Sequence, residues 1–569
     1  ASFASTPDVL GFFSSYTGFR YPYSKYAHVA VRDFPFGGME NVSATTVTRG
    51  ALHSAAEQAV QPTWGLVAHE AAHQWFGDLV TAASWPHIWL NEGFATYFTN
   101  LYQRHAEGEE AFLHGYGGTL DSYLNACRGK NLRALVKYEY RLPMDLFFDG
   151  TVYPGGASRL HLLRGILGEE KFRAGLKLYL ERNAFQSVTS DAFEAAMSEA
   201  GGRDLHAWFA EWVHAPGYPE VEITWQVDAQ GDAVVKLRQT QSTSAGVPAV
   251  FDFPLEVRWQ EGSATRAQQL VVDEREESWT LDLGADFTGF LEFDPEAWVP
   301  ARWKLLEAGS AARARAVHAS SARIRSLACR ELAASGDPAA IGVLWEVALR
   351  DALPALRVEA VGLLAPFLVT DDAARLITLW RGEQSVSVRS AWWRALGRFG
   401  AEAPVNDLMI RVLYDTSALV QDRAVALRSL AAAADPHGRR SMLNSHVFDK
   451  SLPEALQLAA IAQLAVDFPD GTTRSFLLPL TYSGTAETPW RAAALRALVH
   501  WLAEDPEKDP AVASVVYSYK KALLSSSAVL RRAAAEGAGK YPQHFGPEIR
   551  ELMRREPEAR IRRVLEGAN

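Results

Sequence analysis

The pattern of hydrophobic and polar residues divides the chain into three zones. Residues 1–218 mix two patterns: the alternating or β-branched stretches KYAHVAVRDF and SATTV, within residues 25–47, predict strands, and later apolar runs predict helices. Residues 219–298 hold short alternating segments such as VEITWQV and FPLEVRW between turn-rich stretches, which predicts a small antiparallel β-sandwich. Residues 299–569 are rich in Ala, Leu and Arg and predict helices. We therefore expect an α+β fold with several domains.

The helical zone also repeats. The template R-x-x-A-x-x-x-L recurs in four close and three looser copies, whose first positions lie 32 to 40 residues apart. Spacings of three and four residues place its Ala and Leu on one helical face, and the small Ala permits close helix packing. A period of this length predicts stacked helix pairs, as in a HEAT-like solenoid. The copies are Arg325/Ala328/Leu332, Arg357/Ala360/Leu364, Arg389/Trp392/Leu396, Arg423/Ala426/Leu430, Gln457/Ala460/Leu464, Arg491/Ala494/Leu498 and Arg531/Ala534/Ala538.

Composition and charge exclude several functions. A hydrophobic content of 48% is typical of globular proteins, and 569 residues indicate three or four domains. The formal net charge of −10 argues against a general nucleic-acid binder. No stretch approaches the roughly 20 apolar residues that cross a bilayer, so we expect no membrane partner. Two cysteines, Cys127 and Cys329, are too few for a disulfide framework and favour a reducing, cytoplasmic compartment.

The stretch WGLVAHEAAHQWFGDLV is the first candidate for chemistry. Pro62 suits the start of a helix and Gly77 its end. On that helix His69 and His73 are one turn apart, so both imidazoles can reach one Zn²⁺. Glu70 is displaced by one position, where its carboxylate can lie beside an activated water as a general base without being a ligand.

A third ligand is expected, because a catalytic zinc takes three protein ligands and keeps one position open. Glu92 lies in WLNEGFA, with 18 residues between it and His73, at the start of a second apolar helix. If that helix returns antiparallel to the first, its carboxylate completes a set of two His and one Glu.

A further box, Gly37-Gly38-Met39-Glu40-Asn41, lies 27 residues before HEAAH. With this box, and with HExxH followed by 18 residues and Glu, the sequence resembles the aminopeptidase N family of zinc metallopeptidases (gluzincins), which includes leukotriene hydrolase. The resemblance covers the first zone, and the two later zones match the family's domain order. It implies a thermolysin-like peptidase domain in residues 1–218, a β-sandwich in 219–298 and a HEAT- or armadillo-like helical domain in 299–569.

The resemblance also implies roles for the metal cluster. His69, His73 and Glu92 would bind one Zn²⁺ per chain, and Glu70 would activate the water that attacks the peptide bond.

The box would bind the substrate. Glu40 would pair with the free α-amino group of a peptide, so that only the first peptide bond reaches the zinc. Gly37, Gly38 and Met39 would contact the substrate, because glycine backbone lets a peptide approach as an extra strand.

A donor for the oxyanion is expected as well. The family uses a Tyr in a Y-x-K-G context, and Tyr153, in TVYPGG, is the candidate here. Gly155 departs from the family by standing where Lys is usual. Asp78 and Asn91 are candidates for orienting the ligands.

We therefore expect a zinc aminopeptidase for peptides with a free N-terminus, with the helical zone closing over the site. Family members usually begin with a large β domain, and this sequence starts close to the box without Met, so we expect that domain as a separate fragment of the same protein. One alternative is an epoxide hydrolase like leukotriene hydrolase, although that branch lacks the β-sandwich. Another is a catalytically silent scaffold, although such relatives are expected to lose the ligands or Glu70.

Overall fold

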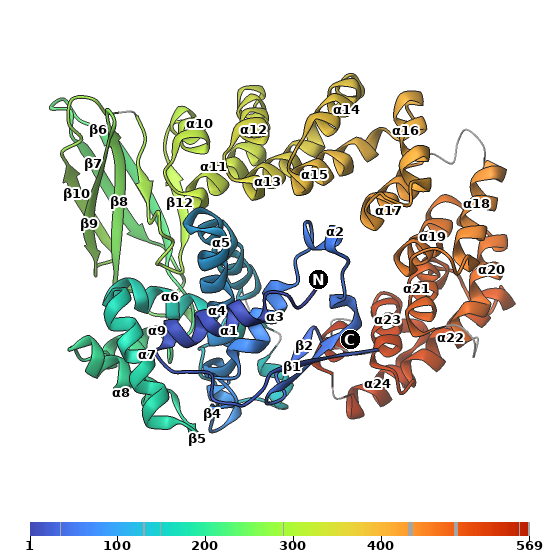
Figure 1. Ribbon diagram of the computed structural model, residues 1–569, viewed down its shortest axis with the longest axis horizontal. Helices are drawn as coiled ribbons and strands as arrows, with labels where there is room; N and C mark the ends of the chain where they lie inside the picture. Colours follow the sequence, from blue (N-terminus) through green and yellow to red (C-terminus); the bar gives the residue numbers. More distant parts are fainter. Residues whose placement is uncertain are drawn as a thin grey trace.

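A computed structural model describes residues 1–566 apart from residues 33, 35, 129–130, 148, 288, 431–435, 483–486 and 557. The strand and helix predictions at those positions lie outside the described residues. Helices and strands are mixed, and helices dominate (Figure 1). Within the described ranges every helix is too short or too polar to cross a membrane.

The first part of the chain builds a helical body beside a small sheet. Strand β1 (Ala27–Val31) pairs in parallel with β3 (Ala44–Thr48), and β2 (Gly38–Met39) pairs antiparallel with the other edge of β3. Helix α3 (Trp64–Ala72) packs on α4 (Trp89–Glu107), and their aromatic and aliphatic side chains share one core. The other elements are α1 (Thr6–Thr17), α2 (Ala55–Gln58), β4 (Val80–Ala82), α5 (Glu109–Ala126), α6 (Gly156–Leu167), α7 (Glu169–Asn183), β5 (Gln186–Val188), α8 (Ser190–Gly201) and α9 (His206–Trp212).

Two sheets follow and share a second hydrophobic core. Their strand orders are β10-β7-β6-β12 and β11-β8-β9. The antiparallel expectation is wrong for β12, which pairs in parallel with β6 and carries the sheet past residue 298. A parallel partner needs a long connection, and the chain reaches β12 only after passing through the second sheet. The strands are β6 (Glu220–Val227), β7 (Ala233–Gln239), β8 (Phe253–Glu261), β9 (Ala264–Val272), β10 (Glu276–Leu281), β11 (Glu292–Phe293) and β12 (Arg302–Leu306).

The remaining helices form an arc (Figure 1). Neighbours in sequence pack as pairs, such as α12 with α13, and alternate helices from α11 to α25 pack on one another. All seven repeat copies begin on the alternate helices α11 to α23, and their apolar positions are buried in a core along the arc. The helices are α10 (Gly309–His318), α11 (Ala322–Ser335), α12 (Pro338–Arg350), α13 (Pro354–Leu364), α14 (Ala373–Gly382), α15 (Val386–Leu396), α16 (Ala403–Tyr414), α17 (Val420–Ser429), α18 (Pro436–Phe448), α19 (Glu454–Asp467), α20 (Gly471–Tyr482), α21 (Thr488–Ala497), α22 (Pro510–Leu523), α23 (Ala528–Ala538), α24 (Gly546–Arg555) and α25 (Ala559–Glu566).

The repeat arginines bind the ends of preceding helices. Arg357 donates from Nε to the carbonyl of Ala348 at 3.1 Å, and Arg423 donates to that of Leu413 at 2.9 Å. These carbonyls lie in the last turns of α12 and α16, where helical partners are missing. The arginines therefore join the two helices of a pair.

The arc contacts the first part of the chain at both ends. Near its start, Arg323 on α11 lies 2.6 Å from the carboxylate of Asp121 on α5. Near its end, Arg562 on α25 donates to the carboxylate of Asp145 at 2.8 Å. The concave side of the arc thus faces the small sheet.

Candidate metal centre and active site

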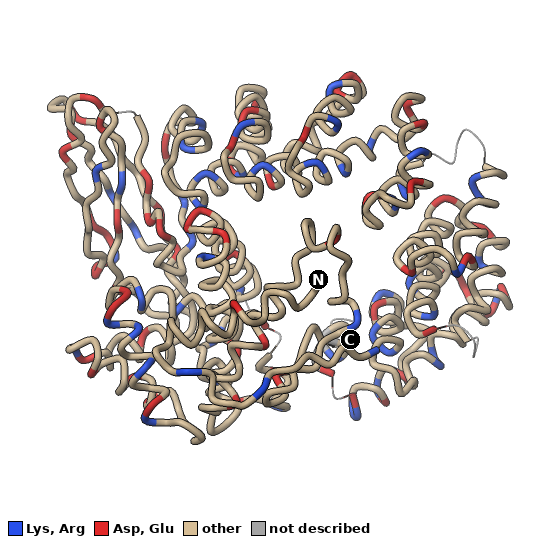
Figure 2. The backbone as a smooth tube through the Cα atoms, viewed as in Figure 1, with Lys and Arg blue, Asp and Glu red and all other residues tan. Residues whose placement is uncertain are grey.

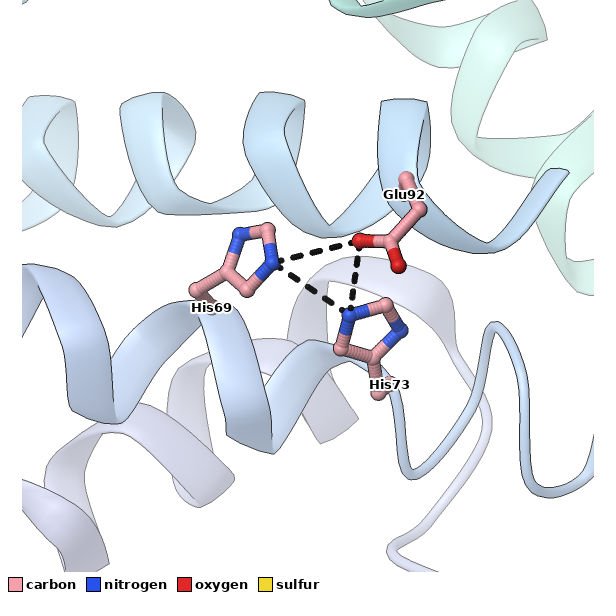
Figure 3. Close-up of side chains that lie close together, drawn as sticks. All are labelled: His69, His73 and Glu92. Carbon is pink, nitrogen blue, oxygen red and sulfur yellow. Dashed lines mark hydrogen bonds and ion pairs between the residues drawn. The ribbon is translucent and has the colours of Figure 1, made fainter. Parts of the chain in front are cut away.

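The three predicted metal ligands converge from two helices (Figure 3). His69 and His73 project from the end of α3, and Glu92 lies in the first turn of α4. Glu92 Oε2 is 3.5 Å from His69 Nε2 and 3.3 Å from His73 Nε2, and the two Nε2 atoms are 3.3 Å apart. Bonds of about 2.0–2.1 Å to a tetrahedral ion place ligand atoms about 3.4 Å apart, so the cluster has the size that Zn²⁺ requires.

The second ring nitrogen of His73 is also engaged. Its Nδ1 lies 3.1 Å from the carbonyl of Phe76, which can only accept a hydrogen bond. Nδ1 therefore carries the proton in a neutral ring, and Nε2 is left with a free lone pair for a metal. The side chain of His73 is 1% exposed and that of His69 22%, so the cluster is reached from the His69 side.

Burial and charge act together on this cluster. Burial alone would lower the pKa of His73, but the carboxylates of Glu92 and Glu40 outweigh it and raise that pKa. Burial alone would raise the pKa of Glu92, but His73 and His69 outweigh it and lower that pKa. The buried carboxylate of Glu92 thus stays ionised beside the imidazole of His73. In such a setting a divalent cation can take the place of the imidazole proton.

Glu70 lies beside the cluster and next to the Gly-Gly-Met-Glu box. Burial raises the pKa of Glu70 to about 7, against the lowering effect of His69 and His73. A Cβ built on Gly38 would lie 2.1 Å from Glu70 Oε1, so any larger residue at this position of β2 would displace the Glu70 carboxylate. Glu40, Glu70 and His73 each place a ligand atom within 4.8 Å of the others.

The box itself runs along the edge of the small sheet. β2 is the edge strand, with Gly38 opposite Val47 and Met39 opposite Thr46. The Met39 side chain is 38% exposed. The structure therefore brings Glu40 to the metal cluster and leaves the rest of the box as a strand edge beside it.

Gln74 connects the box to α3, and sequence reasoning missed it. Its amide nitrogen donates to the carbonyl of Glu40 at 3.1 Å and to Asp78 Oδ2 at 2.7 Å, and its Oε1 accepts from the amide of Ser43 at 2.8 Å. The residue is fully buried. Its only sequence signal is a polar residue directly after HEAAH, in an otherwise apolar run.

Asp78 and Asn91 were expected to orient the ligands, but among the described residues neither side chain hydrogen-bonds to the side chain of His69, His73 or Glu92; the amide of Asp78 donates to the carbonyl of His73 at 2.9 Å. Asp78 accepts from Gln74, and Asn91 Oδ1 accepts from the amide of Ala82 at 3.2 Å. Asp78 therefore acts on the position of Glu40 through Gln74, and Asn91 ties α4 to β4.

Tyr153 lies at the cluster, on a π-helical turn (Thr151–Gly155) directly before α6. Its ring is stacked 6.0 Å from that of His69. Burial, together with the charge of Glu92 and a hydrogen bond to it, raises the pKa of Tyr153 far above the usual value, so the phenol keeps its proton. A Cβ at Gly155 would lie 2.9 Å from the ring of Tyr123, so a larger residue at this position would require that ring to move.

A close approach of two helices, which the sequence did not reveal, places Tyr153 beside Glu92. A Cβ at Gly93 would lie 2.8 Å from Gly156 Cα, and the reverse distance is also 2.8 Å. Glycine at both positions lets α4 and α6 touch at the backbone.

Comparison with known proteins places the first part of the chain among known peptidase sequences. Residues 1–212 match the peptidase family M1 domain. The chain is 30% identical over 284 residues to aminopeptidase M1-A of Oryza sativa subsp. japonica, covering 48% of this chain and 31% of that protein. It is 33% identical over 221 residues to aminopeptidase N of Lactococcus lactis subsp. lactis, covering 37% of this chain and 26% of that protein. The aligned part thus spans about a third or less of these relatives.

A solved structure shares the fold over the whole chain. The crystal structure of Legionella pneumophila aminopeptidase A in complex with aspartic acid superposes with a TM-score of 0.73 at 14% identity, covering 100% of this chain and 73% of that one.

The group of two His and one Glu on two packed helices could hold a metal ion. Residues 1–212 form a domain of the peptidase M1 family, and the resemblance to the aminopeptidase N family is confirmed.

Proposed function

We propose that this protein is a zinc-dependent aminopeptidase that removes the first residue of peptides. One observation carries the proposal: the His69/His73/Glu92 cluster, the Glu70 carboxylate and the Glu40 carboxylate share one small site. The names of the relatives, all aminopeptidases among those reported above, support the same class of reaction.

His69, His73 and Glu92 are the residues that would hold the metal. When bound, Zn²⁺ supplies Lewis acidity and makes water a nucleophile near neutral pH. The ligand separations and the free Nε2 of His73 support this assignment.

Glu70 is the proposed general base. It takes the proton of the attacking water and delivers it to the nitrogen of the leaving amine. A base works best with a pKa near the working pH, and burial gives Glu70 a pKa of about 7. Its place on α3 between the two histidines keeps the carboxylate beside the reacting centre without making it a ligand.

Tyr153 is the proposed oxyanion donor. Its hydroxyl keeps its proton because burial and the neighbouring carboxylate of Glu92 raise its pKa. It would donate a hydrogen bond to the carbonyl oxygen as negative charge develops there, which is where a fixed donor lowers the barrier most.

Glu40 would restrict cleavage to the N-terminal residue of a peptide. Its carboxylate, held near Glu70 and His73, would bind the N-terminal ammonium of the substrate. Gln74 fixes the backbone of Glu40, so the distance from the ammonium to the reacting bond is set by the fold. With the ammonium held at Glu40, only the first peptide bond of a bound peptide would reach the reacting centre.

Metal content and cleavage of an aminoacyl p-nitroanilide test this proposal together. We expect about one Zn²⁺ per purified chain, loss of that zinc in His73→Ala, and cleavage that a chelator abolishes and Zn²⁺ restores. A chain without bound zinc and without cleavage would instead fit the silent scaffold. Zinc binding with hydrolysis of an epoxide but not of the anilide would fit the leukotriene-hydrolase alternative.

A further inference from the structure

A large cavity lies outside the metal cluster, between the small sheet and the C-terminal helices. Its volume is about 1130 Å³, above the roughly 300–1,000 Å³ of typical small-molecule sites. One wall is formed by Arg32, Thr48, Arg49 and Leu52, at the end of the sheet. The opposite wall belongs to α19, α21 and α23 and the turn after α21, and much of it is alanine.

Strand β2 runs toward the metal cluster, so a peptide antiparallel to it leads from the cluster toward this cavity. Glu40 follows β2, so a peptide whose ammonium lies at Glu40 can continue along the β2 edge only antiparallel to it. Such a peptide runs from Glu40 past Gly38 and Gly37. The amide of Thr48 donates to the carbonyl of Gly37 at 2.9 Å, so this end of β2 lies at the end of β3.

Two arginines lie where the antiparallel peptide would leave the sheet. Arg49 directly follows β3, and Arg32 directly follows β1, whose Val31 is opposite Thr48. Arg32 has only a 3.8 Å contact with Glu487. Arg49 is exposed and makes no ion pair with any residue that the structure describes. Figure 2 shows basic positions both at this end of the sheet and on the facing helices.

We infer that Arg49 binds the C-terminal carboxylate of short peptides, so that both ends of the substrate are held. The inference rests on the proposed function, because Glu40 supplies the other end. Glu40 is three residues from Gly37, whose carbonyl accepts from Thr48, and Arg49 follows Thr48, so the span is about 13 Å at roughly 3.3 Å per residue. Peptides of about five to six residues therefore fit best, and longer ones extend along the alanine-lined wall of the cavity.

The test compares peptides of three, six and ten residues with one common N-terminal residue, each as the free acid and as the C-terminal amide. For six residues we expect the free acid to have a kcat/KM about five- to tenfold higher than the amide. For three residues the ratio should be about one. In Arg49→Ala the six-residue ratio should fall to about one, and in Arg49→Lys part of the preference should remain, because the charge is kept. Arg398→Ala, an exposed arginine outside the cavity, is the matched control and should keep the wild-type ratio.

A binding measurement separates this inference from the proposed function. Fluorescence anisotropy with labelled six-residue acid and amide on the Glu70→Gln variant gives Kd without turnover, and we expect the same five- to tenfold preference for the acid. Equal Kd values for acid and amide would overturn the role of Arg49, even if the aminoacyl anilide is cleaved. Anilide cleavage that fails while the acid still binds more tightly would overturn the proposed reaction and leave the carboxylate site standing.

Discussion

Gly93 and Gly156 bring α4 and α6 into backbone contact, since a Cβ on either would lie 2.8 Å from the Cα of the other. Glu92 directly precedes Gly93 on α4, and Tyr153 lies on the turn that leads into Gly156. The contact therefore sets the distance between Glu92, the proposed metal ligand, and Tyr153, the proposed oxyanion donor.

Exchange of Gly93 for Ala should separate these two helices. We expect a loss of about 1–3 kcal/mol in the free energy of unfolding from overpacking, together with a lower kcat because Tyr153 moves relative to Glu92. Urea unfolding and steady-state kinetics measure the two effects. Gly118→Ala on α5 is the matched control, because a Cβ there meets nothing within 4 Å and a helical Ala is favoured over Gly. Unchanged kcat in Gly93→Ala would remove the link between the helix contact and catalysis.

Removal of the Tyr153 hydroxyl should affect the transition state more than substrate binding. In Tyr153→Phe we expect kcat to fall about 10²–10³-fold, with KM and zinc content nearly unchanged. Tyr517→Phe, which alters a tyrosine that is 59% exposed, should leave all three unchanged. A rise in KM at constant kcat would place Tyr153 in ground-state binding instead.

Glu70 and Glu92 should respond differently to the same substitution. Glu70→Gln should keep the zinc and lose about 10²–10⁴-fold in kcat, because a general base is lost and no ligand is. Glu92→Gln should lose zinc affinity as well, because an amide is a weaker ligand than a carboxylate. Zinc analysis after dialysis, beside kcat, separates the two. Loss of zinc in Glu70→Gln to the same extent would argue that Glu70 is itself a ligand.

Glu211 predicts a dependence of stability on pH away from the active site. Burial raises its pKa to about 7, so the folded state binds a proton that the unfolded state releases at lower pH. The free energy of unfolding that the protonated Glu211 contributes is therefore lost as the pH rises from about 4.5 through about 7. Glu211 Oε1 accepts from the amide of Asp252 at 2.9 Å, and Gln retains an acceptor there. We expect the Tm of Glu211→Gln relative to wild type to increase between pH 4.5 and pH 7. A constant difference would contradict the shift.

The two histidines of the candidate metal cluster could be predicted to lie together because their spacing is local to one helix. HEAAH sets two histidines one turn apart on any helix, and the conformation of α3 does the rest. The repeat copies were equally visible, since each lies within one helix or ends one residue beyond it, and the copies recur every 32 to 40 residues.

Other features depend on contacts between distant segments and leave no periodic trace. The parallel pairing of β12 with β6 joins residues about 80 positions apart, and the Gly93–Gly156 contact joins residues 63 positions apart. The role of Gln74 depends on the path of the chain before β3. Such features follow from tertiary packing, which a single sequence does not display.

One experiment addresses the proposed function as a whole. A short peptide with a free N-terminus and the same peptide N-acetylated are incubated with the protein, each with and without a chelator, and the products are identified by mass spectrometry. We expect release of the first residue from the free peptide only, and only without chelator, because the reaction needs both the metal cluster and an ammonium at Glu40. Equal cleavage of the acetylated peptide, or cleavage that the chelator does not affect, would contradict a metal-dependent aminopeptidase.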